Sequence, residues 1–207
     1  MSRRTATPSR LPAAERREQL LDVTKEIVAT RGFHAVSIEA VAREAGVSRP
    51  IVYGHFDDLG GLLEALVLRE TARALHQLTA VLPGDLTAGD PRALLLGGLR
   101  GYLEAVRDDP DTWRLVLMPP EGAPALLRDL LGRGRGAVVA HLADAARPGL
   151  GRGGPSPDPE LTARTLSAVA DEAARLLLTD PERYPVERML AHAKWVLDQL
   201  GPPARRS

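Results

Sequence analysis

The residues with the most obvious binding chemistry are arginines near the N-terminus. Residues 1–17 contain five of them against a single acidic residue, Glu15: Arg3, Arg4, Arg10, Arg16 and Arg17. Guanidinium groups bind phosphate oxygens, so this basic arm could add contacts to a nucleic acid. A solvated tail would have the same composition. The net charge of the chain does not distinguish a nucleic-acid contact from a solvated tail, because 27 Lys and Arg balance 27 Asp and Glu.

Other reactive groups have the wrong type or spacing. The chain has no cysteine, which excludes disulfides, thiolate metal sites and cysteine nucleophiles. The five histidines are scattered, and no carboxylate pair has the spacing of metal ligands. The glycines of residues 149–154 follow no strand and precede no Lys-Ser/Thr pair, so they indicate a linker. We expect no catalytic residue, no metal and no cofactor, and therefore no enzyme.

The most informative segment is SIEAVAREAGVSRPIVYGHF, Ser37 to Phe56. Ser37 can cap a short helix, and Gly46 can take the left-handed conformation that ends it. Val47 then points inward, Ser48 caps a second short helix, and Pro50 lies in its first turn, where a missing N–H costs little. These are the requirements of a helix-turn-helix over residues 37–56, whose second helix enters a major groove.

The same segment resembles the TetR family signature, and the resemblance extends from about Ala14 to Leu68. In register with that signature the chain has Gly32-Phe33, Ser37, Val41-Ala42, Ala45-Gly46-Val47-Ser48 and Tyr53-Gly54-His55-Phe56. The resemblance implies a sequence-specific DNA-binding transcriptional regulator. Such a regulator is a repressor in the leading interpretation, and it leaves its operator when a small, largely apolar ligand binds.

Roles for individual residues follow from this resemblance. Ser37, Tyr53 and His55 should contact DNA phosphates. Ser48, Arg49, Pro50 and Ile51 should face the groove at the start of the recognition helix, with Arg49 as base reader, because a guanidinium can bond to both O6 and N7 of guanine. The core should contain Phe33, Ile38, Val41, Val47, Val52 and Phe56.

Two positions depart from the family pattern. Pro50 stands where the family usually has a small residue, and it removes one backbone donor. Leu59 stands where the family often has a lysine, next to Asp57 and Asp58. These departures favour weaker operator affinity, unless the basic arm compensates. They also support an alternative: an all-helical small-molecule-binding protein or enzyme whose helix-turn-helix is vestigial.

The composition predicts an all-α fold of about nine helices, since aromatic residues are only 3% and alternating β-branched runs are missing. We expect a disordered basic tail over residues 1–12, a DNA-binding domain over 13–73, an effector-binding and dimerisation domain over 74–201, and a tail over 202–207. Within them, the spacing of apolar residues and of Pro and Gly predicts helices over residues 13–31, 92–107, 111–118, 123–146, 159–178 and 182–200. A long helix after Asp58 should turn Leu62, Leu63, Leu66, Val67, Leu75 and Leu78 inward.

The partners expected of this architecture are palindromic double-stranded operator DNA, a small-molecule effector and a second copy of the chain. Polar and aromatic residues on otherwise apolar helices are the effector-site candidates: Tyr102, Trp113, Arg114, Met118 and His141. Trp113 could equally be core, and His141 could be a surface residue. No apolar run reaches the roughly 18 residues of a membrane span, so we expect no membrane association and a cytoplasmic protein. Activation instead of repression stays open.

Overall fold

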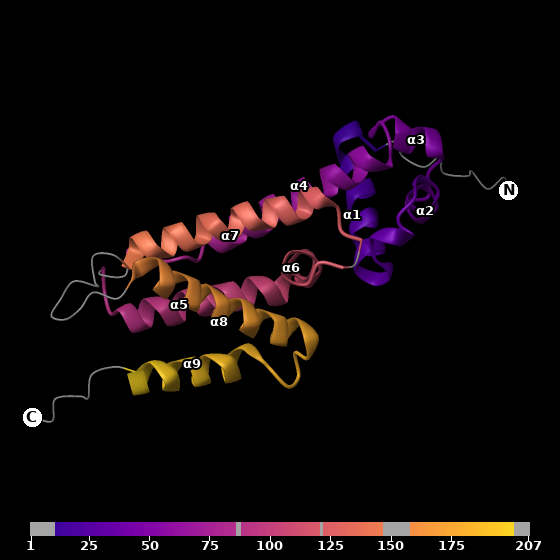
Figure 1. Cartoon of the computed structure of the whole chain (residues 1–207). Helices are drawn as coiled ribbons and strands as arrows, with labels where there is room; N and C mark the ends of the chain where they lie inside the picture. Colours follow the sequence, from indigo (N-terminus) through magenta and orange to yellow (C-terminus); the bar gives the residue numbers. More distant parts are fainter. Residues whose placement is uncertain (1–10, 86–87, 121, 147–157, 201–207) are drawn as a thin grey trace, which may run out of the picture. The chain divides into compact units, whose positions relative to one another are not determined.

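The computed structural model describes residues 11–85, 88–120, 122–146 and 158–200. Within these ranges the regular secondary structure consists of nine α-helices and one short 3₁₀ helix, with no strand (Figure 1). The prediction of an all-helical chain is confirmed. Most of the predicted N-terminal tail, the Gly/Pro-rich linker and the tail over 202–207 lie outside the described residues.

The chain divides into two units. The first contains residues 1–67 and 120–122, and the second contains residues 68–119 and 123–207. Helix α4, Leu59–Thr79, begins in the first unit and continues into the second. The domain boundary placed after residue 73 stays a prediction.

The first unit contains α1, Ala13–Arg31, the 3₁₀ helix η1, Phe33–Ala35, α2, Ile38–Glu44, and α3, Arg49–Tyr53. Helices of five to seven residues are not stable alone, so α2 and α3 depend on a shared core. That core is formed by buried apolar side chains from every element of the unit: Leu20, Leu21, Ile27, Val28, Phe33, Ile38, Val41, Val52, Phe56, Leu62 and Leu66. The predicted core residues are confirmed, except that Val47 is only half-buried.

Caps and turns set where these short helices begin and end. The Ser37 hydroxyl oxygen accepts a hydrogen bond from the Ala40 amide at 3.1 Å, as predicted for the cap of α2. Gly32 and Gly46 have φ angles of 81° and 66°, in the left-handed region. Asp58 Oδ1 accepts the Gly61 amide at 2.7 Å at the start of α4, which explains an acidic residue there.

The prediction for the Ser48 side chain was wrong. Ser48 occupies the position before α3, but its side chain makes no capping hydrogen bond. Pro50, in the first turn, fixes one helical φ angle and needs no partner for an N–H. The start of α3 therefore depends on backbone restriction rather than on a side-chain cap.

The second unit contains the rest of α4 together with α5, Pro91–Asp108, α6, Pro110–Leu117, α7, Ala125–Ala146, α8, Pro159–Thr179, and α9, Val186–Leu200. Helix α9 begins four residues later than predicted, because Tyr184 precedes Pro185 and a residue before proline disfavours the helical region. Residues 181–183 form a turn instead, and Tyr184 lies in a bend.

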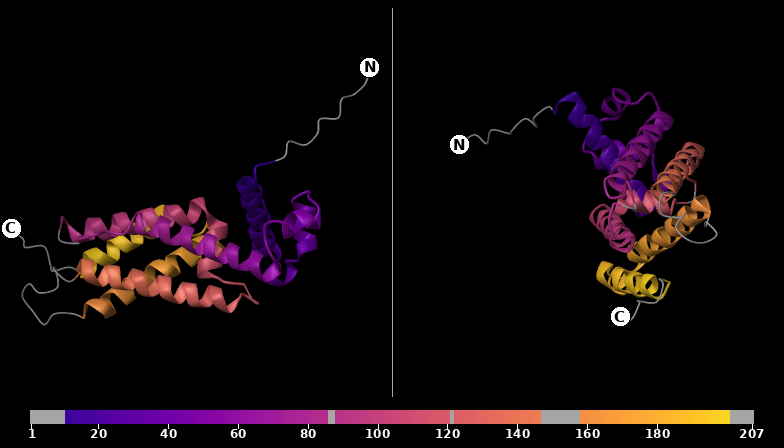
Figure 2. Two further views of the ribbon diagram at one scale, coloured as in Figure 1. Left: turned by 90° about the horizontal axis from the view of Figure 1, so that it is seen from above. Right: turned by 90° about the vertical axis from the view of Figure 1, so that its left-hand side faces the viewer.

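Helix α8 is central to this unit: it packs against α5, α6 and α7, and α5 also packs against α9 (Figures 1 and 2). One apolar cluster joins five helices: Ala74, Tyr102, Leu103, Val106, Trp113, Leu117, Ala174, Leu177, Leu178, Val186 and Leu190. The expectation for Leu75 was wrong, since its side chain is 38% exposed. It lies one residue beyond the buried Ala74, and the core-facing stripe of α4 passes through Ala74 and Leu78 instead.

Replacement of Gly46 by alanine should destabilise the first unit by about 1–2 kcal/mol, because an L-residue in the left-handed region is strained. Gly136, in α7, is the control. An added Cβ meets open space at both positions, but only Gly46 has positive φ. Gly136→Ala should stabilise its helix by up to about 1 kcal/mol. Segment-resolved hydrogen exchange measures both effects, and a similar change in protection for the two variants would contradict the explanation.

Candidate nucleic-acid interface

Helix α3 lies on the surface of the first unit with one side chain buried. Val52 is fully buried, whereas its neighbours Ile51 and Tyr53 are 40% and 53% exposed. Ser48, Arg49 and Pro50 are exposed as well. The buried Val52 and the packing of α3 on α2 hold the helix in place. The rest of its surface is therefore available to a ligand.

Arg49, the predicted base reader, has a partner that the sequence did not reveal. Its Nη1 donates a hydrogen bond to Oε1 of Glu39 on α2, and both side chains are more than half exposed. This hydrogen bond holds the pKa of the Glu39 carboxyl below its usual value. Ten residues separate the two along the chain, and only the packing of α2 on α3 brings them together.

The predicted phosphate contacts differ in exposure. Tyr53 is exposed, whereas Ser37 and His55 are half-buried. The Ser37 oxygen already accepts the Ala40 amide, but its hydroxyl proton is still available to donate to a phosphate. The structure thus places five of the seven predicted DNA contacts fully on the surface and two partly so.

Arg17, one of the arginines of the predicted basic arm, makes contacts within the first unit. It lies on α1, its Nη1 donates to the His55 carbonyl at 3.0 Å, and its guanidinium carbon lies 4.4 Å from the centroid of the Phe56 ring. Arg17 therefore ties α1 to the segment that follows α3. No local pattern predicts this contact, because the two residues are 38 positions apart in the chain.

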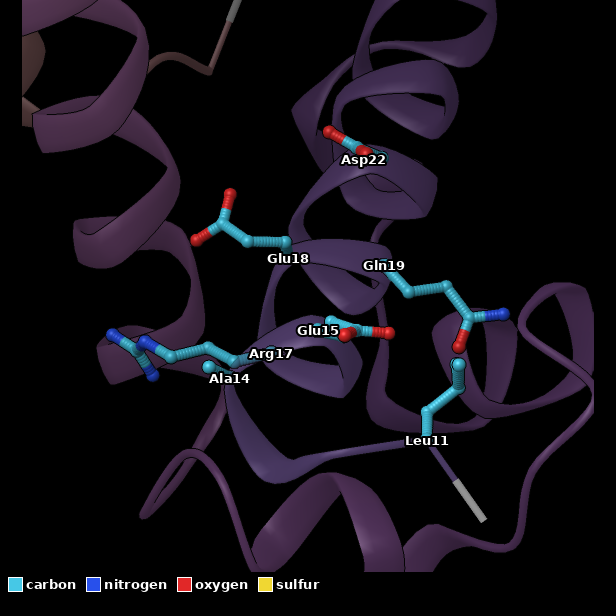
Figure 3. Close-up of a pocket in the computed structure, with 7 residues that line it drawn as sticks. All are labelled: Leu11, Ala14, Glu15, Arg17, Glu18, Gln19 and Asp22. Atoms are coloured by element: carbon cyan, nitrogen blue, oxygen red, sulfur yellow. The ribbon is translucent and has the colours of Figure 1, made fainter. Parts of the chain in front are cut away.

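A shallow surface hollow lies along the first half of α1 and includes Leu11, two residues before this helix (Figure 3). It is lined by Leu11, Ala14, Glu15, Arg17, Glu18, Gln19 and Asp22. Three of the four charged side chains are acidic, which disfavours binding of phosphate. We therefore place the candidate interface at α3 and not here.

In the second unit, two of the predicted effector residues lie together. The rings of Tyr102 and Trp113 meet edge to face, with centroids 5.1 Å apart and planes at 75°. The Trp113 Nε1–H donates to Gln77 Oε1 at 2.8 Å, and the Tyr102 hydroxyl donates to Asp171 Oδ1 at 3.3 Å. Both side chains are buried, so they are part of the core of this unit.

The other three predicted effector residues are exposed. Arg114 forms an ion pair with Asp111 at 3.1 Å, and Met118 is 44% exposed. His141 Nε2 lies 3.1 Å from the Pro83 carbonyl oxygen. None of them shares the buried setting of Tyr102 and Trp113.

A polar cluster that the sequence did not indicate surrounds Asp171. Arg135 on α7 forms an ion pair with its Oδ2 at 3.0 Å, and Tyr102 on α5 binds its other oxygen. Burial raises the pKa of Asp171, although the nearby Arg135 and Arg175 act in the opposite direction. Burial, with the charge of Asp171, also raises the pKa of Tyr102. The cluster places a carboxylate and a phenol between three helices.

A second buried polar group lies on α4. Glu70 is fully buried, forms an ion pair with Arg69 at 2.7 Å, and accepts a hydrogen bond from the Thr112 hydroxyl of α6. Further along α4, Arg73 pairs with Asp109 at 2.8 Å, immediately before α6. Together with the Gln77–Trp113 bond, these contacts fix the C-terminal part of α4 to α6.

The described part of the chain offers neither a metal site nor a membrane span. No three His, Asp or Glu residues there are grouped as metal ligands. None of the described helices is long and apolar enough to cross a membrane.

Comparison with known proteins points to one family. Residues 20–66 match the family model described as "Bacterial regulatory proteins, tetR family". The "HTH-type transcriptional activator FasR" of Mycolicibacterium smegmatis is 32% identical over 108 residues, which cover 52% of this chain and 48% of that protein. The chain therefore aligns with about half of the length of this relative.

Solved structures extend the similarity to the second unit. A TetR-like transcriptional regulator from Rhodococcus sp. RHA1 superimposes with a TM-score of 0.69 at 22% identity, covering 93% of this chain and all of that one. A SmeT–triclosan complex gives a TM-score of 0.67 at 22% identity, covering 93% of this chain and 98% of that one. At this identity the match shows a common fold.

Replacement of Arg17 by alanine should loosen the segment after α3. The loss of one hydrogen bond and one cation–π contact should cost about 1–2 kcal/mol, measured as faster hydrogen exchange of the Phe56 amide. Arg17→Lys keeps the charge but not the planar group, so it should restore only part of the protection. Unchanged exchange in Arg17→Ala would show that the contact does not stabilise this segment.

Proposed function

We propose that this protein is a sequence-specific DNA-binding transcriptional regulator, because residues 20–66 match the model of bacterial regulatory proteins of the tetR family. The observation that carries the proposal is the exposure of α3: one residue anchors the helix and the others face solvent. A vestigial motif, as in the alternative of a binding protein or enzyme, would not require this arrangement. The proposed place of action is the cytoplasm.

Sequence would be read from the first turn of α3. Arg49 can donate two hydrogen bonds to the O6 and N7 atoms of guanine, and the exposed Pro50 and Ile51 can contact a thymine methyl group. Ser37, Tyr53 and His55 lie at the ends of α2 and α3, where hydroxyl and imidazole groups can bind phosphates. The residues that determine specificity are thus distinct from those that position the helix.

The protein would act as a homodimer. Helices α8 and α9 expose large apolar side chains: Leu161 is 62%, Val169 63% and Trp195 58% exposed. These exposed apolar side chains on α8 and α9 are the support for a contact with a second copy of the chain. A dimer with two-fold symmetry presents two copies of α3 to two half-sites about one helical turn apart, so the operator is expected to be palindromic.

The second unit would bind a small, largely apolar effector. The support is the apolar core around Tyr102 and Trp113 and the common fold with a protein solved in complex with triclosan. Helix α4 is continuous from the first unit into the second, where Glu70, Arg73 and Gln77 hold it to α6 and the residues next to it. A ligand that shifts α6 would therefore shift α4. In the proposed repressor this movement releases DNA. By linkage, operator binding must lower the affinity for the ligand by the same factor by which the ligand lowers the affinity for the operator.

Selection of bound fragments from random duplex DNA tests the proposal directly. The wild-type protein should enrich a palindrome, and a protein that enriches no sequence would overturn the proposed function. On the enriched operator, Arg49→Ala should cost about 1–3 kcal/mol and relax the preference at one base pair. Tyr53→Ala should lower the affinity for all DNA sequences equally, because a phosphate contact does not distinguish between bases. An equal loss on every sequence with Arg49→Ala would instead assign Arg49 to phosphate binding.

Replacement of Val169 by glutamate should separate the protomers. A charge on an exposed apolar position costs little in a monomer but is costly when the partner buries it. Sedimentation velocity should show a shift from dimer to monomer, and affinity for the palindrome should fall. Ala137→Glu, on the exposed surface of α7, is the control. A Val169→Glu variant that sediments like the wild type would place the dimer contact elsewhere.

A further inference from the structure

Glu39 lies beside the residue proposed to read the operator, yet it has the charge that DNA repels. It is the second residue of α2, and its Oε1 accepts a hydrogen bond from Nη1 of Arg49, the first residue of α3. The pair crosses the turn of the helix-turn-helix at its exposed surface. An acidic side chain on a surface proposed to bind DNA is unfavourable unless it has a specific role.

The backbone leaves little freedom in where the two side chains start. Val41, Ala42 and Ala45 are buried on one side of the turn and Val52 on the other, and Gly46 fixes the chain between them. Glu39 and Arg49 therefore face each other because of the core, and not because of their own attraction. An exposed ion pair adds little to the stability of the fold. Its main effect is therefore on the orientation of the Arg49 side chain.

The hydrogen bond to Glu39 engages only one nitrogen of the Arg49 guanidinium. A guanidinium has five N–H donors in one plane, and Glu39 accepts from Nη1 alone. The remaining donors are sufficient for a bidentate contact with guanine, and a side chain held by one of its nitrogens loses less freedom on binding. The carboxylate also disfavours any pose in which a phosphate takes the place of the base.

Resting on the proposed function, we propose that Glu39 is a specificity-determining positioning residue: it orients Arg49 toward one base pair and penalises binding to other DNA. The low pKa of Glu39 supports this role, because the carboxyl stays ionised under ordinary conditions of DNA binding. Affinity and selectivity should therefore respond in opposite directions when the carboxylate is removed.

The test compares full-length variants on the enriched operator, on an operator changed at the base pair read by Arg49, and on unrelated duplex. Glu39→Ala should reduce discrimination between the first two by about two- to tenfold, the range expected when one long side chain loses its order. Its affinity for unrelated duplex should rise. Glu39→Gln, whose amide oxygen can still accept from Arg49, should recover part of the discrimination.

Glu44 supplies the matched control. It lies at the other end of α2, is exposed to a similar degree, and pairs with Arg31 at 3.2 Å and Arg43 at 3.6 Å. Glu44→Ala removes the same charge, so it should raise affinity for all duplexes without changing discrimination. Equal loss of discrimination in the Glu39 and Glu44 variants would show a general charge effect and overturn the assignment.

A double-mutant comparison separates orientation from direct contact. In an Arg49→Ala background, Glu39→Ala should leave base preference unchanged, because no side chain remains for it to orient. A further change in preference would mean that Glu39 itself contacts a base. A wild-type protein that selects an operator while Glu39→Ala keeps full discrimination would overturn this inference alone, whereas a wild-type protein that selects no DNA would overturn the proposed function.

Discussion

The proposed DNA-reading surface depends on the packing of α2 against α3 across the turn at Gly46. The turn needs a φ angle of 66°, which glycine adopts without strain, and it brings Val41, Ala45 and Val52 into one core. A five-residue helix is not stable on its own, so the packing of α2 against α3 sets the direction of every side chain on α3. The Glu39–Arg49 pair and the exposure of Tyr53 both follow from it.

The second unit differs from the first in the number of polar groups that lie within or beside its apolar core. Its helices share an apolar core, but buried polar groups lie within or beside it: Glu70 with Thr112, Gln77 with Trp113, and Tyr102 with Asp171. Buried groups of this kind need partners in a fixed geometry, because an unmatched donor or acceptor costs more than the bond gains. The first two of these pairs hold α4 to α6.

Local patterns predicted most of the helices. The first helix begins and ends where the sequence placed it, and Ser37, Gly46 and Asp58 have the roles expected of a cap, a turn and a helix start. The errors have local causes too: Ser48 makes no capping bond, Leu75 lies off the core-facing stripe, and Pro185 delays α9. Helical periodicity fixes a face to within about one residue, which is too coarse to decide Leu75.

The sequence by itself determined the helix-turn-helix, since its signals are caps, turn residues and apolar spacing within twenty residues. It also narrowed the candidate DNA contacts to seven residues, on α3 or next to it and at the start of α2. Only the tertiary structure showed that Glu39 binds Arg49, that Arg17 binds the His55 carbonyl, and that Tyr102 and Trp113 are core residues while Arg114, Met118 and His141 are exposed. The reason is physical: local rules set each helix and its faces, whereas contacts between residues far apart in the chain depend on how the helices cross.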